Sequence, residues 1–425
     1  MTATIENARQ LLQAGEWAAA ERAFEAVLEQ APGDVEALNF VALAALRAGR
    51  VDRAMDLVQE AVRVAPADPV TQFHLGKVLE AREAVREAAQ AYGRAVASRP
   101  DFYVARLAYA TALESVGRAD EALLQYARCL KDAQREGRWI DAATTPAPLR
   151  PRVEHAVRTF RAGRRHLYAR LIEPLRVRFG AEALQRFDKC LRIYLREDAP
   201  DRPDPRQQPS FLFFPDLPTA PYIDRAALPW VPQFEAQADA IRAELLTVVE
   251  SAEGRERVFA DPELERRNLR GSTRTPAWNG YYFWRHGERR EDNCTRCPAT
   301  AAVLEAVPLA RVRGHAPEVL FSVFTPGTHL LPHRGVTNTR IVVHLPLIVP
   351  ADCALNVGGE LHVWREGQVV AFDDTYEHEA WNRSDAVRIV LILDVWNPYL
   401  TDVERLAVAD LVGAIGDLRA AIAGA

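Results

Sequence analysis

Residues 339–349, TRIVVHLPLIV, form a run of β-branched and other apolar residues that predicts a buried β-strand. Two similar runs follow it, GQVVAFDD (367–374) and AVRIVLILDV (386–395). Upstream, aromatic and β-branched runs separated by turns begin near Trp278. We therefore expect a β domain in the C-terminal part of the chain.

The segment that precedes this domain is rich in proline, which is disfavoured inside helices and central strands. Nine prolines lie between residues 200 and 232: Pro200, Pro203, Pro205, Pro209, Pro215, Pro218, Pro221, Pro229 and Pro232. This composition marks a domain boundary. A helix is predicted directly after it, over QFEAQADAIRAELLTVVE (233–250).

The first third of the chain carries a 34-residue repeat. Three series of residues keep this period: Pro32, Pro66 and Pro100; Ala20, Ala54, Ala88 and Ala122; and Gly15, Gly49 and Gly117, with Glu83 breaking the glycine series. Two antiparallel helices per repeat explain all three, with alanine at the close helix crossing, glycine in the turn and proline after the second helix. One larger packing position per repeat is filled by Phe24, Val58, Tyr92 and Tyr126. The pattern resembles a tetratricopeptide array over residues 1–135.

Residues 136–199 predict a helical connector of two or more amphipathic helices, interrupted near Pro174 and Gly180. Residues 403–425 are expected to form a C-terminal helix. The predicted fold class is therefore α+β and multidomain, with an all-α solenoid before the β domain.

The composition excludes some classes of partner. The chain has 425 residues, with 53 Lys and Arg against 58 Asp and Glu and a net charge of −5, so no nucleic-acid or anionic-membrane surface is expected. No stretch approaches the roughly 18–20 apolar residues needed to cross a bilayer, and five cysteines do not form a disulfide framework. A soluble, cytoplasmic protein is expected. Cys294 and Cys297 form a CxxC without a second pair, which favours ordinary loop cysteines over a structural zinc site.

Histidines gather in the β domain, where seven of the ten lie between His286 and His378. His333 lies beside a turn in LLPHRGVTN, and His378 lies at a strand end in FDDTYEHEAWN. Arg388 follows ten residues later inside a strand. Two imidazoles followed by a basic strand residue match the order of parts in a double-stranded β-helix oxygenase, in which imidazoles hold Fe(II) and the cation pairs with 2-oxoglutarate. The usual carboxylate ligand would stand two residues after the first histidine, where this chain has Gly335.

Three stretches together resemble the aspartyl/asparaginyl β-hydroxylase family: FSVFTPGTHLLPHRGVTNTRIVVHLPL (321–347), FDDTYEHEAWN (372–382) and VRIVLILDVWNP (387–398). Members of that family bind iron through two histidines and have glycine at the carboxylate position. The similarity covers roughly residues 205–402 and implies a double-stranded β-helix (jelly-roll or cupin-like) domain, placed here at residues 200–402.

Carried over residue by residue, the resemblance implies that His333 and His378 are the catalytic iron ligands. It places Arg388 on the distal carboxylate of 2-oxoglutarate and Ser322 and His344 at further cosubstrate contacts. The implied cofactors are Fe(II), 2-oxoglutarate and O2.

One position departs from the family. Val342 stands where the family usually has an arginine, two residues before the strand histidine. Arg340 has the same strand parity, so we expect it to face the same side and to substitute in part. Asp373 and Asp374, close to His378, either orient a ligand imidazole or form the turn before it.

The resulting expectation is a 2-oxoglutarate-dependent dioxygenase that hydroxylates an unactivated carbon, which the family name places at the β-carbon of Asp or Asn in a peptide or protein. The repeats either dock this polypeptide or stabilise the catalytic part. Two alternatives stay open: a non-catalytic repeat-based interaction module, and a hydroxylase of a free amino acid or small metabolite. The substrate and the oligomeric state do not follow from the sequence.

Overall fold

The computed structural model describes residues 4–249, 253–271 and 277–424. The chain divides into two compact units: Met1–His166 with Leu418–Ala425, and Leu167–Asp417. None of the helices in the described ranges combines the length and the apolar character needed to cross a bilayer.

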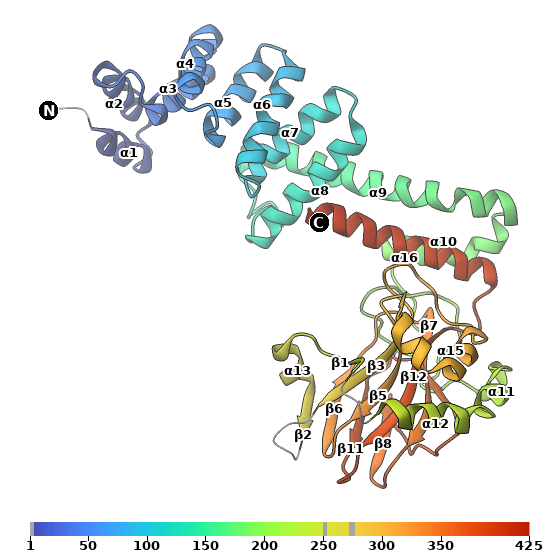
Figure 1. The fold of residues 1–425 in the computed structure, drawn as a ribbon. Helices are drawn as coiled ribbons and strands as arrows, with labels where there is room; N and C mark the ends of the chain where they lie inside the picture. Colours follow the sequence, from blue (N-terminus) through green and yellow to red (C-terminus); the bar gives the residue numbers. More distant parts are fainter. Residues whose placement is uncertain (1–3, 250–252, 272–276, 425) are drawn as a thin grey trace. The chain divides into compact units, whose positions relative to one another are not determined.

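The first unit is a series of paired helices (Figure 1). The helices are α1 (Ile5–Gln13), α2 (Trp17–Gln30), α3 (Val35–Arg47), α4 (Val51–Val64), α5 (Pro69–Ala81), α6 (Val85–Ser98), α7 (Tyr103–Ser115) and α8 (Ala119–Arg135), followed by the 3-10 turn η1 (Ala147–Leu149). Each pair packs most extensively within itself, as the repeat predicts.

The periodic residues take the positions that the sequence assigned to them. The four repeat alanines and the four larger residues are almost completely buried: Ala20, Ala54, Ala88, Ala122, Phe24, Val58, Tyr92 and Tyr126. Gly15, Gly49 and Gly117 close the turns between paired helices with φ of 79°, 72° and 81°. Glu83 takes the same left-handed conformation with φ of 61°, so this turn is kept without glycine. The repeat architecture predicted from the sequence is confirmed.

The connector differs from the prediction in one respect. A single helix, α9 (Arg150–Phe179), runs through Pro174 and ends before Gly180, where φ is 83°. Pro174 therefore does not end the helix, although it removes one backbone donor. The turn η2 (Glu182–Leu184) and helix α10 (Gln185–Tyr194) complete the segment. The helix α16 spans Asp402–Ala423, so it begins one residue before the C-terminal helix that the sequence predicts at residues 403–425.

The second unit is built on two antiparallel sheets. Within the described residues, the larger sheet has the strand order β1-β3-β5-β12-β7-β10, with β4 on β3, and the smaller has the order β2-β6-β11-β8-β9. The strands are β1 (Arg255–Arg257), β2 (Leu269–Gly271), β3 (Trp278–Arg285), β4 (Glu288–Arg289), β5 (Val319–Phe324), β6 (Thr328–His333), β7 (Arg340–Ile348), β8 (Cys353–Val357), β9 (Glu360–His362), β10 (Val370–Phe372), β11 (His378–Asn382) and β12 (Arg388–Trp396). Its remaining helical segments are η3 (Arg225–Ala227), α11 (Val231–Glu235), α12 (Ala238–Val248), α13 (Pro262–Asn268), α14 (Glu291–Arg296) and α15 (Pro298–Glu305). This arrangement is compatible with the predicted double-stranded β-helix.

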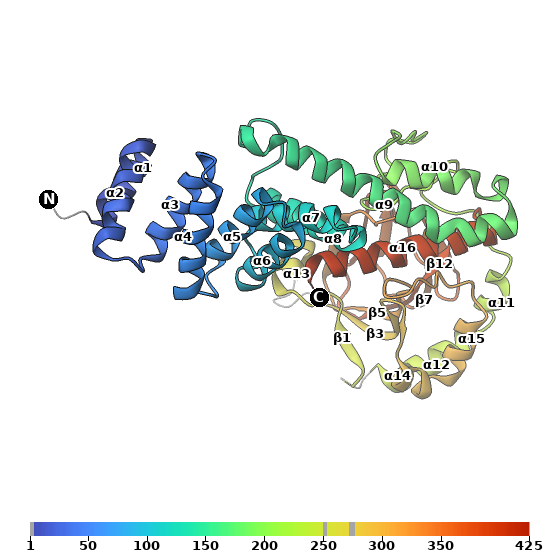
Figure 2. The same cartoon turned by 90° about the horizontal axis from the view of Figure 1, so that it is seen from above.

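Alternation along the strands separates two cores. On the outer face of the larger sheet, Phe321, Val343 and Leu391 pack against α11, α12, α14 and α15 (Figure 1, Figure 2). The opposite face turns toward the smaller sheet, where Phe324 and Phe372 pack against smaller-sheet residues. Helices therefore close one side of the larger sheet, and the space between the sheets is left for a site.

Candidate active site

His333 and His378 meet where two strands of the smaller sheet pair. His333 ends β6, His378 begins β11, and their Cα atoms are direct partners in the antiparallel ladder. Their ring centroids lie 4.1 Å apart. In each ring Nδ1 donates to a backbone carbonyl two residues earlier, at 2.9 Å to Leu331 O and at 3.0 Å to Tyr376 O. These bonds fix the tautomer, so both Nε2 lone pairs are available for a metal ion.

Burial keeps both imidazoles neutral. It lowers the pKa of His333 below its ordinary value, and burial with the neighbouring His333 lowers the pKa of His378 to about 3. A neutral imidazole is the form that binds a metal. Within the described part of the chain, no three His, Cys, Asp or Glu side chains converge on one point as a metal cluster would require. The protein therefore offers two imidazole ligands at this point.

Arg388 is a buried cation at one end of the same space. It is 1% exposed and lies between two aromatic rings, 3.9 Å from the centroid of Phe324 and 4.8 Å from that of Trp364. Its Nη1 lies 3.4 Å from Ser322 Oγ, its Nε has no hydrogen-bond partner, and no carboxylate among the described residues pairs with it. Burial lowers its pKa to about 9. A guanidinium held in this way is prepared for an anionic ligand, because an unpaired buried charge is costly.

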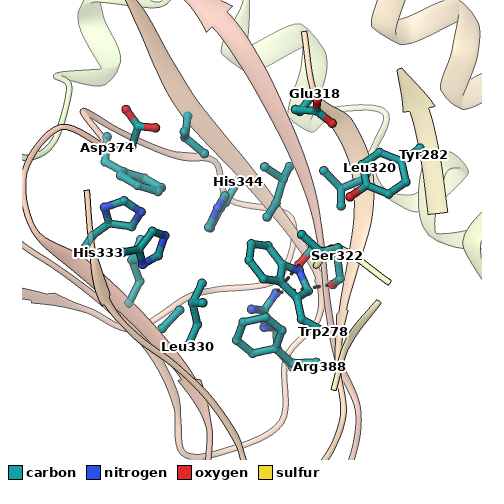
Figure 3. A pocket seen from close by; sticks show the side chains of 18 of the residues that line it. Trp278, Tyr282, Glu318, Leu320, Ser322, Leu330, His333, His344, Asp374 and Arg388 are labelled. Atoms are coloured by element: carbon teal, nitrogen blue, oxygen red, sulfur yellow. Dashed lines mark hydrogen bonds between the residues drawn. The ribbon is translucent and has the colours of Figure 1, made fainter. Parts of the chain in front are cut away.

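Ser322 lies beside Arg388, and His344 lies between Arg388 and the histidine pair (Figure 3). Ser322 Oγ accepts a hydrogen bond of 2.9 Å from the indole of Trp278 and is fully buried. His344 packs on Phe372 at a centroid distance of 5.1 Å, and its Nδ1 is buried without a partner. Burial lowers the pKa of His344 well below its ordinary value, so the ring is neutral.

The two histidines, the buried arginine, Ser322 and His344 line one cavity of about 320 Å³. Figure 3 shows its two ends, with Arg388, Trp278 and Ser322 at one end and His333 with Asp374 at the other, and His344 between them. The structure thus brings together His333, His378, Ser322, His344 and Arg388, which are far apart in the sequence. The unpaired polar atoms of Arg388 and His344 and the free Nε2 atoms fit a bound divalent metal with an anionic chelating ligand.

Arg340 does not lie with the five residues that line the cavity. It lies on β7 in the parity expected, but its guanidinium pairs with Asp394 of β12 and it does not line the cavity. The expected partial substitution for the family arginine is therefore wrong: Val342 lines the cavity, and the cation two residues away is held by an acidic neighbour.

Asp374 lies against Gly335. The amide of Gly335 donates to the carbonyl of Asp374 at 2.6 Å, and a Cβ built on Gly335 would overlap with the Asp374 carboxyl group. Asp374 lines the cavity, its Oδ1 has no partner, and burial raises its pKa to about 7. A carboxyl group from another strand connection thus fills the space beside the glycine. The turn role belongs to Asp373, whose Oδ1 accepts from the amide of Thr375 at 2.9 Å.

Some residues that contribute to the site could not be identified from the sequence alone. Trp364 and Phe324 enclose the arginine only because β12 pairs with β5 and because Trp364, on the segment between β9 and β10, packs over it. Cys294 lies in α14 and Cys297 between α14 and α15, and both are buried in the core over the larger sheet, so the predicted loop position is wrong.

Comparison with known proteins agrees with both parts of the architecture. Residues 235–398 match the family model described as Aspartyl/Asparaginyl beta-hydroxylase, and residues 5–69 and 73–137 match Tetratricopeptide repeat. The repeat region is also similar to the solved structure of YrrB, a TPR protein with an unusual peptide-binding site, with 24% identity, a TM-score of 0.28 and coverage of 30% of this chain and 66% of that chain.

Three curated relatives match the C-terminal part. Human aspartyl/asparaginyl beta-hydroxylase is 37% identical over 168 residues, covering 39% of this chain and 21% of that protein. The ornithine lipid ester-linked acyl 2-hydroxylase of Rhizobium tropici is 35% identical over 190 residues, covering 44% and 64%. Human aspartate beta-hydroxylase domain-containing protein 2 is 32% identical over 213 residues, covering 49% and 56%. The chain thus spans between about a fifth and two thirds of the length of these relatives. The C-terminal part of the chain is thus similar to the aspartyl/asparaginyl beta-hydroxylase family, and the part before it is similar to tetratricopeptide repeats.

Proposed function

We propose that this chain is an Fe(II)- and 2-oxoglutarate-dependent dioxygenase that hydroxylates an unactivated carbon. The observation that carries the proposal is one cavity in which two neutral imidazoles present free Nε2 atoms while a buried arginine lacks a carboxylate partner among the described residues. The family supports a hydroxylase, since the relatives that match this domain are named as hydroxylases.

The overall reaction converts R–H, O2 and 2-oxoglutarate into R–OH, succinate and CO2. One oxygen atom enters the C–H bond and the other enters the new carboxyl group of succinate. The substrate carbon and the keto acid each lose two electrons, and O2 accepts four. When bound, the iron supplies the redox activation of O2.

The chain's own residues hold and orient the reactants. His333 and His378 bind the metal, and Arg388 with Ser322 binds the distal carboxylate of 2-oxoglutarate. The rings of Phe324 and Trp364 hold the guanidinium in one plane and exclude water from it. Asp374, beside Gly335, presents an unpaired oxygen to the cavity and orients water near the metal.

The names of the relatives offer two classes of substrate. Two are named for aspartyl or asparaginyl groups and one for an ester-linked acyl group. A peptide or protein substrate also agrees with the repeat array, which would dock it.

The test is release of succinate by the full chain with Fe(II), ascorbate and 2-oxoglutarate. We expect His333→Ala and His378→Ala to abolish it. His329→Ala is the matched control, because His329 lies on the same strand but pairs with Glu379 at 2.8 Å outside the cavity lining. A wild-type chain that binds no iron and consumes no 2-oxoglutarate would instead support the non-catalytic interaction module.

A further inference from the structure

We infer that the carbon hydroxylated at this site belongs to an uncharged alkyl group, and that the cavity excludes a substrate carboxylate such as an aspartyl side chain. This inference rests on the proposed function and narrows its substrate class. It is argued from the residues that remain in the cavity once the metal ligands and the cosubstrate contacts are assigned.

The register of the larger sheet orders the inner wall of the cavity. Arg388 pairs with Phe324 at the end assigned to 2-oxoglutarate, and Val390 pairs with Ser322 in the next inward-facing row. One row further, Ile392 lies between Leu320 on β5 and His344 on β7. The row after that places Val342 opposite Asp394. Along this wall, the polar residues assigned to 2-oxoglutarate are therefore followed by aliphatic side chains with increasing distance from Arg388.

The facing wall is also apolar. Leu330, Ala380 and Leu355 come from β6, β11 and β8 of the smaller sheet, and Phe372 on β10 of the larger sheet adds an aromatic ring next to Val342. Burying a methylene against such a wall is favourable, whereas a carboxylate without a cation or donors loses its hydration without compensation. The wall next to the metal ligands thus favours an alkyl group.

Two acidic side chains of the lining disfavour a substrate carboxylate. Glu318 and Asp374 line the cavity, and in Figure 3 both lie away from Arg388. Arg285 lines it too, but its guanidinium pairs with Glu256. His286 stands beside Glu318, with Nδ1 at 2.9 Å from the carboxylate. Among the described lining residues, the guanidinium of Arg285 is therefore committed to an acidic partner, and a substrate carboxyl group would meet Asp374 beside the histidine pair and Glu318 near Leu320.

The test compares peptides that are identical except for a central norvaline, asparagine or aspartate. Asparagine and aspartate side chains have nearly the same shape, so this pair isolates the charge, and norvaline then replaces the polar group by an alkyl group of similar size. Hexanamide is a fourth probe, which carries an alkyl chain without a peptide and thus distinguishes the two sources of that chemistry. Binding to the full chain with Mn(II) and 2-oxoglutarate is measured by calorimetry, and added oxygen by mass spectrometry with Fe(II).

We expect the alkyl probes to bind at least tenfold more tightly than the aspartyl peptide, with asparagine between them. Val342→Arg should reverse the order by placing a guanidinium beside His344, while Val342→Ile should keep it. Equal or tighter binding of the aspartyl peptide by the wild-type chain would overturn the inference. Succinate release in the absence of any probe reports on the proposed function separately, so the two failures are distinguishable.

Discussion

Replacing Gly335 by alanine should destabilise the second unit through one contact. The new methyl group would overlap with the buried carboxyl group of Asp374, which the structure places against the glycine. Overpacking of this kind costs about 1–3 kcal/mol, and the smaller backbone entropy of alanine in the unfolded chain offsets about 0.4–1 kcal/mol of it. We expect a net loss of about 1–2 kcal/mol, which lowers the melting temperature by about 2–4 °C for each kcal/mol in a unit of this size.

The partner of the clash can be removed independently. Asp374→Ala deletes the carboxyl group, so the double variant Gly335→Ala/Asp374→Ala should recover most of the loss, with a coupling energy of about 1–2 kcal/mol in a double-mutant cycle by chemical denaturation. Gly413→Ala, inside α16, is the control: its new Cβ would lie 3.5 Å from Nη2 of the Arg313 side chain, so helix propensity should make the change neutral or stabilising. Additive effects within about 0.5 kcal/mol would refute the reasoning that Asp374 fills the space beside the glycine.

Three further predictions concern other parts of the chain. Arg388→Ala should raise the 2-oxoglutarate concentration needed for half-maximal succinate release, and an unchanged requirement would show that another residue is the anchor. Gly76→Ala should destabilise the repeat array by about 1–3 kcal/mol in thermal unfolding because its Cβ would overlap with the ring of Tyr92, whereas Gly33→Ala, with 3.7 Å to its nearest neighbour, should change it little. Burial lowers the pKa of His74 to about 4 in the folded array, so as the pH falls the unfolded chain binds a proton on this residue before the folded chain does. The free energy of unfolding of the array should therefore decrease, by at most about 3 kcal/mol, as the pH falls from 6.5 toward 4. Chemical denaturation across that range should show the loss, and His74→Phe should flatten it; a variant with the wild-type slope would contradict the assignment.

The repeats were predictable because their packing is local. Each repeat contacts its neighbours, so alanine, glycine and proline recur at one period, and Glu83 shows that the turn survives the loss of its glycine. The strands of the β domain were also predictable, since TRIVVHLPLIV and AVRIVLILDV correspond to β7 and β12 within two residues at each end. Pro174 was misleading, because proline weakens a helix without always ending it.

The site was predictable only in part. His333 and His378 stood out beside a turn and at a strand end and Arg388 inside a strand, their roles were implied by the family resemblance, and the structure brings all three to one cavity. The position of Asp374 depends on how the loop before β11 packs on Gly335, which no spacing in the sequence encodes. Arg340 shows what the alternation of side chains along a strand cannot predict. Alternation fixes the side of the strand on which Arg340 lies, but the ion pair with Asp394 determines the position of its guanidinium group.

The most direct measurement is anaerobic equilibrium binding of Fe(II), with Mn(II) followed by electron paramagnetic resonance as a second readout, in the presence of 2-oxoglutarate. The account predicts one ion per chain, lost in His333→Ala and in His378→Ala and retained in His329→Ala. Binding that survives removal of both imidazoles, or a wild-type chain that takes up no metal ion, would contradict it.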